Sequence, residues 1–309
     1  MNLLVTGSSG LIGTALLERL RHDGEEHSVV RLVRGDAGTA PGTTDVSWSP
    51  TQGQIDVAGL ERAGPFDGVV HLAGAGIGDR RWSAARKAVI LESRTDSTRL
   101  LVDTLLRMSD RPPVVVSASA VGFYGDRGDE ELTEASASGA GFLAEICRAW
   151  EAAAQPAADA GIRTVLLRTG IVLSRHGGAW GKQLPLFRIG LGGRMGPGHQ
   201  YRSWITLDDE VGAILHCLAD DGLVGPVNAT APAPATDAEL AKVIGSVLHR
   251  PTVLAVPAVA LRLALGTEMA DELILAGQRV LPAALEASGY AFAHPELEEA
   301  VRSVLTGPG

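Results

Sequence analysis

The sequence predicts an α/β protein with a doubly wound parallel sheet, followed by a smaller, mixed and mainly helical C-terminal region. Two observations predict this class. Short apolar runs alternate with segments of helical periodicity through the first half of the chain, as in sheets covered by helices on both faces. The first run, residues 2–6, ends in a glycine-rich turn that opens a helix. Together they indicate a sheet of the Rossmann type with right-handed crossovers.

The elements of the first half follow from periodicity and length. Residues 11–22 and 86–108 carry apolar side chains at helical spacing. Residues 35–53 are rich in Gly, Pro and Thr, so we expect irregular structure there, with one short strand near Val46. Four other apolar runs are short enough to be buried parallel strands, namely residues 28–33, 68–72, 113–117 and 166–172.

The regular alternation of apolar runs and helical segments ends after Val172. Residues 177–198 are crowded with glycine and are expected to form loops around one short helix at 182–188. Residues 225–230 predict a further short strand, and residues 237–248 a helix capped by Asp237. The tail from Val256 onward reads as mainly helical. Within it, residues 267–280 have the composition of an amphipathic helix, whose apolar face belongs either to the core or to an interface.

Composition excludes several classes of protein. A net charge of -9 argues against nucleic acid as the main partner, because phosphate binding needs a basic face. The two cysteines, Cys147 and Cys217, give no disulfide framework and no metal-ligand spacing, so we expect buried free thiols, as in the cytoplasm. No apolar run reaches the ~18 residues that span a bilayer. No lysine-rich tail points to an anionic membrane, and the N-terminus enters a strand without a signal peptide.

The turn after the first strand has the spacing of a dinucleotide-binding loop. Gly7 permits the tight turn, Gly10 lets the backbone approach a pyrophosphate, and Gly13 lets the helix pack on the sheet. The start of the helix presents free N–H groups to the anion. The alternative is a glycine-rich turn without a ligand. The expected cofactor contacts in this loop are Gly7, Ser9, Gly10, Leu11, Ile12 and Gly13.

The end of the second strand predicts which dinucleotide binds. NAD-binding sites usually place Asp or Glu there, to hold the ribose 2′-hydroxyl. This chain has Arg34 instead, with Arg31 nearby, and an arginine can pair with a 2′-phosphate. Asp36 is the competing residue, and a solvated surface arginine is the alternative role for Arg34. We therefore expect NADP(H), with NAD(H) as the second candidate.

Small residues at the ends of later strands are further candidates for cofactor contacts. Carboxyl ends of parallel strands share one edge of the sheet, where such ligands bind. Each position alone is equally compatible with core packing or an ordinary turn. The candidates are Leu72, Ala73 and Gly74 after one strand, Ser117 and Ser119 after another, and Gly170 and Ile171 after a third.

Several motifs resemble those of a known group. The stretches Val-Thr-Gly-Ser-Ser-Gly-Leu-Ile-Gly (5–13), His-Leu-Ala-Gly (71–74), Tyr-Gly-Asp (124–126) and Trp-Ile-Thr-Leu-Asp-Asp (204–209) are similar to extended short-chain dehydrogenases/reductases (SDRs), the class of sugar-nucleotide epimerases and dehydratases. More specific are Arg-Arg-Trp (80–82), Glu-Ser-Arg (92–94), residues 117–129, Gly-Pro-Val-Asn-Ala-Thr-Ala-Pro (225–232) and Gly-Gln-Arg-Val-Leu-Pro (277–282). These resemble the atypical branch called epimerase family proteins, which carries a small C-terminal domain of unknown function.

The resemblance covers essentially the whole chain and implies a site. It implies a Rossmann domain, an NADP-type cofactor, and a cleft for a sugar-nucleotide-like substrate. Arg34 is then expected on the 2′-phosphate, and Arg94 as a further cofactor contact. One departure matters, because ordinary members carry a catalytic Tyr-x-x-x-Lys. Here Phe142 and Ile146 stand at the expected positions, and neither side chain can hold or transfer a proton.

Two domains follow from these assignments. Residues 1–175 form the expected NADP-binding domain, to which strands and helices near 204–230 return. Residues 176–309 supply loops on the substrate side and the small C-terminal domain. Within the glycine-rich region, Arg194, His199 and Trp204 are candidate substrate contacts, since an arginine beside an aromatic ring can hold a phosphate or a sugar face. A polar loop anchored by Trp204 is the alternative.

The candidates for chemistry are few. Ser119 matches the catalytic Ser/Thr of the resembled family. Tyr124 and Glu145 are the nearest ionisable residues in sequence, with packing in a turn as the alternative for Tyr124. Glu145 reads as a solvated helix residue and His71 as a packing residue at a strand end. No metal-ligand spacing occurs among the histidines.

Two functions remain open from the sequence. One is an NADP-dependent oxidoreductase or epimerase acting on a small polar or nucleotide-sugar-like molecule. The other is a non-catalytic NADP(H)-binding sensor or regulator. The missing Tyr-Lys pair favours the sensor, whereas Ser119 and the long substrate-like region favour the enzyme, which we adopt. The sequence leaves the oligomeric state open.

Overall fold

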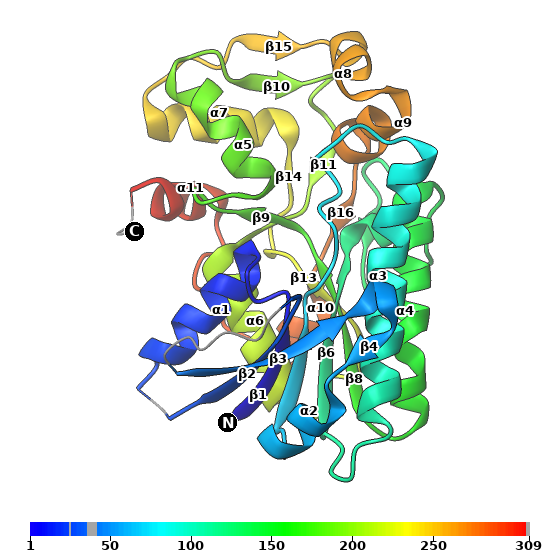
Figure 1. Ribbon diagram of the computed structural model, residues 1–309. Helices are drawn as coiled ribbons and strands as arrows, with labels where there is room; N and C mark the ends of the chain where they lie inside the picture. The colour runs from blue at the N-terminus through cyan, green and yellow to red at the C-terminus, as the bar shows by residue number, and fades with distance from the viewer. Residues whose placement is uncertain (25, 36–41, 307–309) are drawn as a thin grey trace.

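The expected parallel sheet has eight strands in the part of the chain that is described. The computed structural model describes residues 1–24, 26–35 and 42–306. Figure 1 shows the sheet with its helices in the lower part of the molecule and a smaller lobe above. The spatial order is β13-β8-β6-β5-β1-β2-β3-β4, parallel except for β4. The bounds are β1 (Asn2–Thr6), β2 (Ser28–Val33), β3 (Thr43–Ser49), β4 (Gln54–Ile55), β5 (Gly68–His71), β6 (Val114–Ala120), β8 (Arg163–Thr169) and β13 (Gly225–Ala229).

Helices cover both faces of this sheet, as predicted. Leu3 and Val5 of β1 face one core, and Leu4 between them faces the other, because side chains alternate along a strand. The first core is covered by α1 (Leu11–His22) and α6 (Leu207–Ala219), and the second by α2 (Val57–Ala63), α3 (Ala84–Leu105) and α4 (Phe142–Asp159). The strand order reverses between β1 and β5, so a crevice is expected at the carboxyl edge there.

The smaller lobe packs around buried aromatic side chains. Trp180, Phe187 and Trp204 share one core with apolar residues of three helices, α5 (Gly178–Arg188), α7 (Asp237–Leu248) and α11 (Leu297–Thr306). Four two-stranded sheets connect segments within this lobe or link the lobe to the sheet domain. They are β10 (Gly193–Met195) with β15 (Leu254–Val256), β11 (Tyr201–Arg202) with β14 (Ala235–Thr236), β12 (Trp204–Thr206) with β9 (Ile171–Leu173), and β16 (Arg279–Val280) with β7 (Glu131–Leu132).

Short helices complete the chain. Two 3-10 turns lie in the sheet domain, and the C-terminal region is helical, as expected. The bounds are η1 (Pro50–Gln52), η2 (Val121–Tyr124), α8 (Ala258–Leu265), α9 (Thr267–Ala270), the π-helical η3 (Asp271–Leu275) and α10 (Ala283–Ala287).

The strand predicted over residues 166–172 is two strands. β8 ends at Thr169, and β9 begins at Ile171 and pairs with β12 rather than with the large sheet. Gly170 makes the break possible, because a Cβ there would lie 2.5 Å from the carbonyl oxygen of Ser203. The continuous apolar pattern concealed this change of partner.

The cap predicted for α7 is wrong by one residue. Thr236 is the N-cap, and it forms a capping box in which Glu239 closes on the Thr236 backbone N–H. Asp237 is buried instead, where it accepts from the Met195 N–H and pairs with Arg202. Local propensity favours Asp237 as the cap, but its carboxylate instead forms a tertiary ion pair with Arg202.

The single amphipathic helix predicted over residues 267–280 is also wrong. The segment is one α-helical turn, α9, then the π-helical η3, and then the short strand β16. The carbonyls of Leu273 and Ile274 accept from the buried Arg202 guanidinium. Backbone groups drawn toward this cation leave the regular α-helical ladder.

The described residues include neither a membrane-spanning helix nor a metal-binding cluster. None of their helices is long and apolar enough to cross a membrane. They contain no group of His, Cys, Asp and Glu side chains that could hold a metal ion. Cys147 and Cys217 are buried free thiols, which confirms that part of the prediction.

α6 carries a carboxyl group into the core. Glu210 is fully buried, its Oε1 accepts a 2.7 Å hydrogen bond from Thr169 Oγ1, and its Oε2 has no partner among the described residues. Burial raises the pKa of Glu210 to about 8, although the hydrogen bond from Thr169 acts in the opposite direction and lowers it. The folded protein therefore keeps this carboxyl protonated at neutral pH.

Replacement of this group should show in the pH dependence of folding. In the unfolded chain Glu210 titrates near 4.5, so its contribution to stability is fully present below that pH and is lost as pH rises toward 8. We expect Glu210→Gln to gain stability over wild type by about 1.4 kcal/mol per pH unit across this window. Urea unfolding at several pH values between 5 and 8 measures it. A difference that stays constant with pH would contradict the assignment.

Candidate functional site

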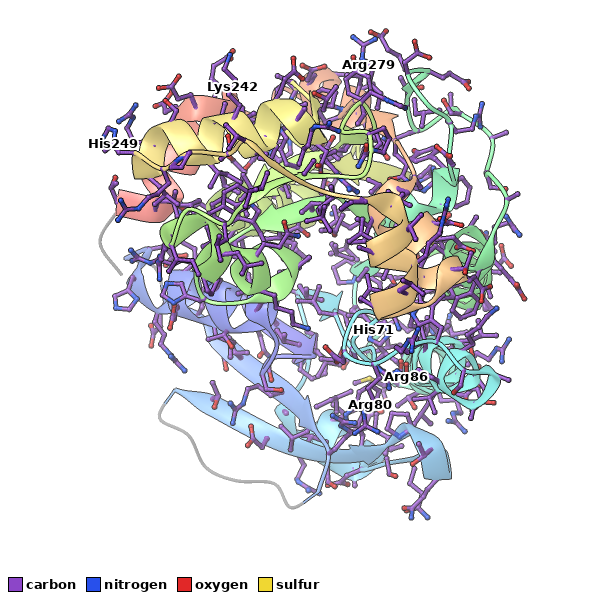
Figure 2. The ribbon with its side chains drawn as sticks, turned by 90° about the horizontal axis from the view of Figure 1, so that it is seen from above. His71, Arg80, Arg86, Lys242, His249 and Arg279 are labelled. Carbon is purple, nitrogen blue, oxygen red and sulfur yellow. The ribbon has the colours of Figure 1, made fainter. Side chains whose placement is uncertain are left out.

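A cavity of about 350 Å³ lies at the carboxyl edge of the sheet. Its walls come from the turn after β1, the end of β5, the β8–β9 break and the start of α5. Figure 2 looks down on this edge, with α5 (green) and the α8–α9 segment (orange) on opposite sides of the view. The lining residues are Gly7, Gly10, Leu11, Ile12, Gly13, Leu72, Gly170, Ile171, Val172, Gly178 and Ala179.

The three glycines of the turn have different tasks. Gly7 has a φ of +68°, and a Cβ on it would lie 2.6 Å from the Leu72 carbonyl carbon. A Cβ on Gly13 would lie 2.4 Å from the Gly7 carbonyl oxygen. The added Cβ of Gly10 meets only that oxygen, at 3.3 Å. Packing therefore requires glycine at positions 7 and 13. At Gly10 the lack of a side chain instead leaves space on the side of the cavity.

The start of α1 is electrostatically suited to an anion. Its N-cap, Gly10, provides no side-chain cap, and its first turn holds no acidic residue. Thr14 donates the first intrahelical bond, to the Gly10 carbonyl, so the N–H groups of Leu11, Ile12 and Gly13 have no partner within the helix. The helix dipole adds partial positive charge at the same place.

The two arginines of β2 have separate roles. Arg31 forms a two-pronged ion pair with Asp45 on β3, with N–O distances of 2.6 and 2.7 Å. Arg34 is exposed where β2 ends, and no described residue forms an ion pair with it. Asp36, the competing residue, lies outside the described part of the chain. Of the pair, Arg34 is the guanidinium available to a ligand.

His71 holds the end of β5 in place. Its Nδ1 lies 2.7 Å from Thr6 Oγ1 and its Nε2 2.9 Å from Thr98 Oγ1. Thr98 donates its own proton to the Arg94 carbonyl, so His71 Nε2 is the donor and Nδ1 the acceptor. Burial lowers the pKa of His71 to about 4, so the ring is neutral. His71 is a packing residue, as expected, and it fixes the strand end beside Leu72.

Arg94 is a buried cation without a carboxylate partner among the described residues. Its Nη1 donates to the carbonyls of Ala75 and Ile90, its guanidinium lies 4.9 Å from the Trp150 ring centre, and its Nε has no acceptor. Burial lowers the pKa of Arg94 to about 10, which still leaves it charged at neutral pH. Gly74 lies directly against it, since a Cβ there would be 3.2 Å from the guanidinium carbon.

The α4 residues that face the end of β6 are Leu143 and Cys147. A Cβ on Gly122, just after β6, would lie 3.2 Å from Leu143 Cβ, and Cys147 Sγ lies 3.6 Å from the Ala120 carbonyl oxygen. Phe142 and Ile146, the positions expected from the resemblance, belong to a hydrophobic cluster with Ile90 of α3, which Leu143 also joins. The correction is one residue along the helix. The conclusion holds, because Leu143 and Cys147 are no Tyr-Lys pair either.

Cys147 is a thiol rather than a thiolate. Burial, together with the nearby Glu151 carboxylate, raises its pKa to about 12, while Arg94 opposes the shift. The proton is therefore retained at any physiological pH.

A chain of buried polar groups runs behind the end of β6. Ser119 Oγ donates to Glu151 Oε1 at 2.6 Å, and Glu151 forms a two-pronged pair with Arg168, both bonds 2.8 Å. Arg168 donates to the Tyr124 hydroxyl, which donates to Asn228. Both serines of this strand end, Ser117 and Ser119, are buried, and Ser117 Oγ has no hydrogen-bond partner in the described part of the chain.

Tyr124 is placed as an interior residue. Its side chain is 0% exposed and its hydroxyl is held on both sides, so the packing alternative describes it better than a proton donor does. Burial raises its pKa. Glu145 is exposed on α4, as expected for a solvated helix residue.

The start of α4 is closed by the C-terminal region. The Glu272 carboxylate accepts from the N–H of Phe142 at 2.9 Å and of Leu143 at 2.8 Å. Gly141 has a φ of +100°, and a Cβ on it would lie 3.0 Å from that carboxylate. The sequence carries no local signal for this contact, because 130 residues separate Glu272 from Phe142.

The candidate substrate residues lie in the smaller lobe and not in the cavity. Trp204 is fully buried and donates from Nε1 to the Ala233 carbonyl. Arg194 donates to the carbonyls of Gly196 and Pro197, and His199 is exposed. These contacts favour the anchored-loop alternative for Trp204 and Arg194.

The cavity gathers part of the expected cofactor set. Arg34, Ala73, Gly74, Arg94, Ser117, Ser119 and the exposed Ser9 are not among its lining residues. Val172, Gly178 and Ala179 line it without having been predicted. The adjacent glycines Gly177 and Gly178 were the available signal, since they let α5 begin against the Leu11 side chain.

A wider depression, of about 700 Å³, lies at the amino edge of the sheet. It contains none of the expected site residues, and Glu26 and Asp67 are among its walls. The starts of parallel strands are also the edge where α/β sheets do not bind ligands. The smaller cavity is therefore the candidate site.

Comparison with known proteins gives matches along the whole chain. Residues 3–228 match the NAD dependent epimerase/dehydratase family, and residues 256–304 match a domain of unknown function, DUF1731. An epimerase family protein of Mycobacterium bovis is 44% identical over 306 residues, covering 99% of this chain and 98% of the relative.

Solved structures show the same architecture. Human epimerase family protein SDR39U1 (isoform 2), crystallised with NADPH, has a TM-score of 0.86 and 33% identity, covering 98% of this chain and 99% of that one. A nucleoside-diphosphate sugar epimerase of Corynebacterium glutamicum has a TM-score of 0.76 and 37% identity, covering 97% of this chain and 57% of that one. The predicted fold class and the family resemblance are confirmed.

The glycine turn gives a matched pair of variants. We expect Gly13→Ala to lower the free energy of unfolding by about 1–3 kcal/mol, because the new Cβ would press on the Gly7 carbonyl. Gly10→Ala should cost less, because its Cβ is 3.3 Å from that oxygen rather than 2.4 Å. Urea unfolding compares them. Equal losses would show that this contact does not control the turn.

Proposed function

Since the chain belongs to the NAD dependent epimerase/dehydratase family, we propose that it binds NADP(H) in the carboxyl-edge cavity and works as an oxidoreductase or epimerase. Its substrate would be a small polar or nucleotide-sugar-like molecule. The observation that carries the proposal is the uncapped start of α1, which opens onto the cavity beside Gly10. The NADPH in the crystals of the human relative supports the choice of cofactor.

The residues present fit such a cofactor. The free N–H groups of α1 suit a pyrophosphate, and Gly10 leaves room for its approach. Arg34, exposed and free of ion pairs with described residues, suits a 2′-phosphate. The Nε of Arg94, buried and without an acceptor, is a further donor on the α3 side. Bound there, the cofactor would supply a hydride donor or acceptor.

Proton transfer falls to Ser119 in this proposal. Its hydroxyl is 2.6 Å from Glu151 Oε1. In alcohol oxidation, Ser119 Oγ takes the substrate proton and releases its own to the Glu151 carboxylate; in carbonyl reduction, Ser119 Oγ gives its proton to the substrate oxygen and regains one from the protonated Glu151 carboxyl. Arg168 holds Glu151 in place with two bonds. Tyr124 then supports Arg168 rather than the reacting atoms.

Calorimetric titration with NADPH and NADH tests the cofactor assignment. We expect NADPH to bind more tightly, and Arg34→Ala to weaken NADPH binding by about tenfold or more without changing NADH binding, because only NADPH carries the 2′-phosphate. Arg21→Ala, an exposed arginine at the end of α1, is the control and should change neither. Equal binding of both cofactors, unaffected by Arg34→Ala, would overturn the assignment to NADP(H).

NADPH oxidation across a panel of carbonyl substrates tests the chemistry. We expect Ser119→Ala to slow turnover by about 100-fold or more, with NADPH affinity unchanged, because it removes the proton route. Tyr124→Phe should keep most of the rate of the folded enzyme, because that hydroxyl serves packing. The reverse pattern would place the proton route on Tyr124. NADPH binding without turnover on any substrate would favour a sensor.

A further inference from the structure

Large aliphatic side chains gather on one part of the smaller lobe. Two short segments, residues 186–191 and 253–263, hold most of the large hydrophobic side chains that are well exposed. We call the surface they form the aliphatic surface. Its members, between 50% and 88% exposed, are Leu186, Ile189, Leu191, Val253, Val259 and Leu263. Scattered single exposures are ordinary, but a gathered set marks an interaction site.

The two segments are adjacent although about 60 residues separate them in sequence. β10 pairs in register with β15, Gly193 opposite Leu254. Arg250 Nε donates to the Arg188 carbonyl at 2.9 Å, and a Cβ on Gly190 would touch Pro251. α8 follows β15 directly. Figure 1 shows β10, β15 and α8 together at the top of the molecule, away from the large sheet.

The charge of this region is opposite to that of the chain. Residues 178–198 and 248–266 contain no Asp or Glu, although the chain has 36 acidic residues and a net charge of -9. Basic residues are the charged residues there, namely Lys182, Arg188, Arg194, His249, Arg250 and Arg262. Of these, Lys182 pairs with Asp79 and Arg262 with Asp271, which leaves arginines such as Arg188 around the aliphatic surface.

This combination identifies the kind of partner. We propose that the aliphatic surface docks the protein on an anionic lipid bilayer. Aliphatic side chains gain by entering the boundary of the acyl chains, and arginines gain by meeting lipid phosphates. A second copy of the chain fits less well, because a two-fold contact would bring together two surfaces whose segments, residues 178–198 and 248–266, carry basic but no acidic residues. The expectation of no membrane partner rested on the lack of a lysine-rich tail, whereas here two distant segments supply the basic residues.

Docking would also act on the cavity. α5 begins at Gly178, which lines the cavity, and ends beside the aliphatic surface. Its Lys182 reaches Asp79 on the loop after β5 at 3.2 Å. The same helix therefore connects the aliphatic surface with the cavity.

Vesicle co-sedimentation of the full chain tests the proposal. The probes are vesicles of phosphatidylcholine alone and of phosphatidylcholine with about 30% phosphatidylglycerol, an anionic lipid. We expect the protein to sediment with the anionic vesicles, not with the neutral ones, and to be released at about 0.5 M salt, which screens the charges.

Variants at exposed positions separate docking from folding. Ile189→Glu with Leu263→Glu should weaken binding to the anionic vesicles by about tenfold or more, because each change removes an aliphatic contact and adds a repelled charge. Val224→Glu is the matched control, since Val224 is 62% exposed just before β13, at the amino edge of the sheet. It should bind like wild type. Circular dichroism confirms that all variants are folded.

The overturning results are distinct. No sedimentation of wild type with anionic vesicles ends the proposal, and so does equal binding to neutral ones. Equal weakening by Val224→Glu would show that the aliphatic surface is not the docking site. Light scattering that finds a wild-type dimer, dissociated by Ile189→Glu with Leu263→Glu, would assign the surface to a second copy if the vesicles are not bound.

Discussion

The contact between the turn after β1 and the end of β5 controls what is built on the carboxyl edge of the sheet. A side chain on Gly7 would overlap the peptide between Leu72 and Ala73. Thr6 Oγ1 accepts hydrogen bonds from the N–H groups of Leu72 and Ala73, and it also bonds to His71 Nδ1. Because this contact sets where α1 begins, it also sets where the free N–H groups of that helix point and where the cavity opens.

Two buried arginines, Arg94 and Arg168, lie on the α3–α4 side of the sheet. Arg94 has no carboxylate partner among the described residues, whereas Arg168 and Glu151 form a two-pronged pair. Burying such a pair gains little net stability, since desolvation offsets much of the attraction. Its structural effect is positional, because it fixes Ser119 at the end of β6. The side chains of α4 nearest that strand end, Leu143 and Cys147, carry no charge. The fixed polar groups are Ser119 on β6, Arg168 on β8 and Glu151 further along α4.

The C-terminal region is joined to the sheet domain at the same edge. Glu272 binds the first N–H groups of α4, Lys87 pairs with Glu268 at 2.6 Å, and Arg81 donates to the Leu263 carbonyl. α8, which carries part of the aliphatic surface, is thus held next to the loop after β5. In this arrangement the matched domain of unknown function makes its charged contacts with the sheet domain and turns its exposed aliphatic residues outward.

The sequence by itself determined the parallel sheet, the helices on both faces, and the glycine turn that opens α1, because periodicity and turn geometry act over a few residues. Only the tertiary structure decided where β8 breaks, which α4 residues face β6, and that Tyr124 is interior. It also brought together residues 186–191 and 253–263, and Glu272 with α4. These outcomes depend on packing and polar contacts between segments about 30 to 130 residues apart. Such contacts produce no periodic pattern in the sequence of either segment, so the sequence alone does not reveal them.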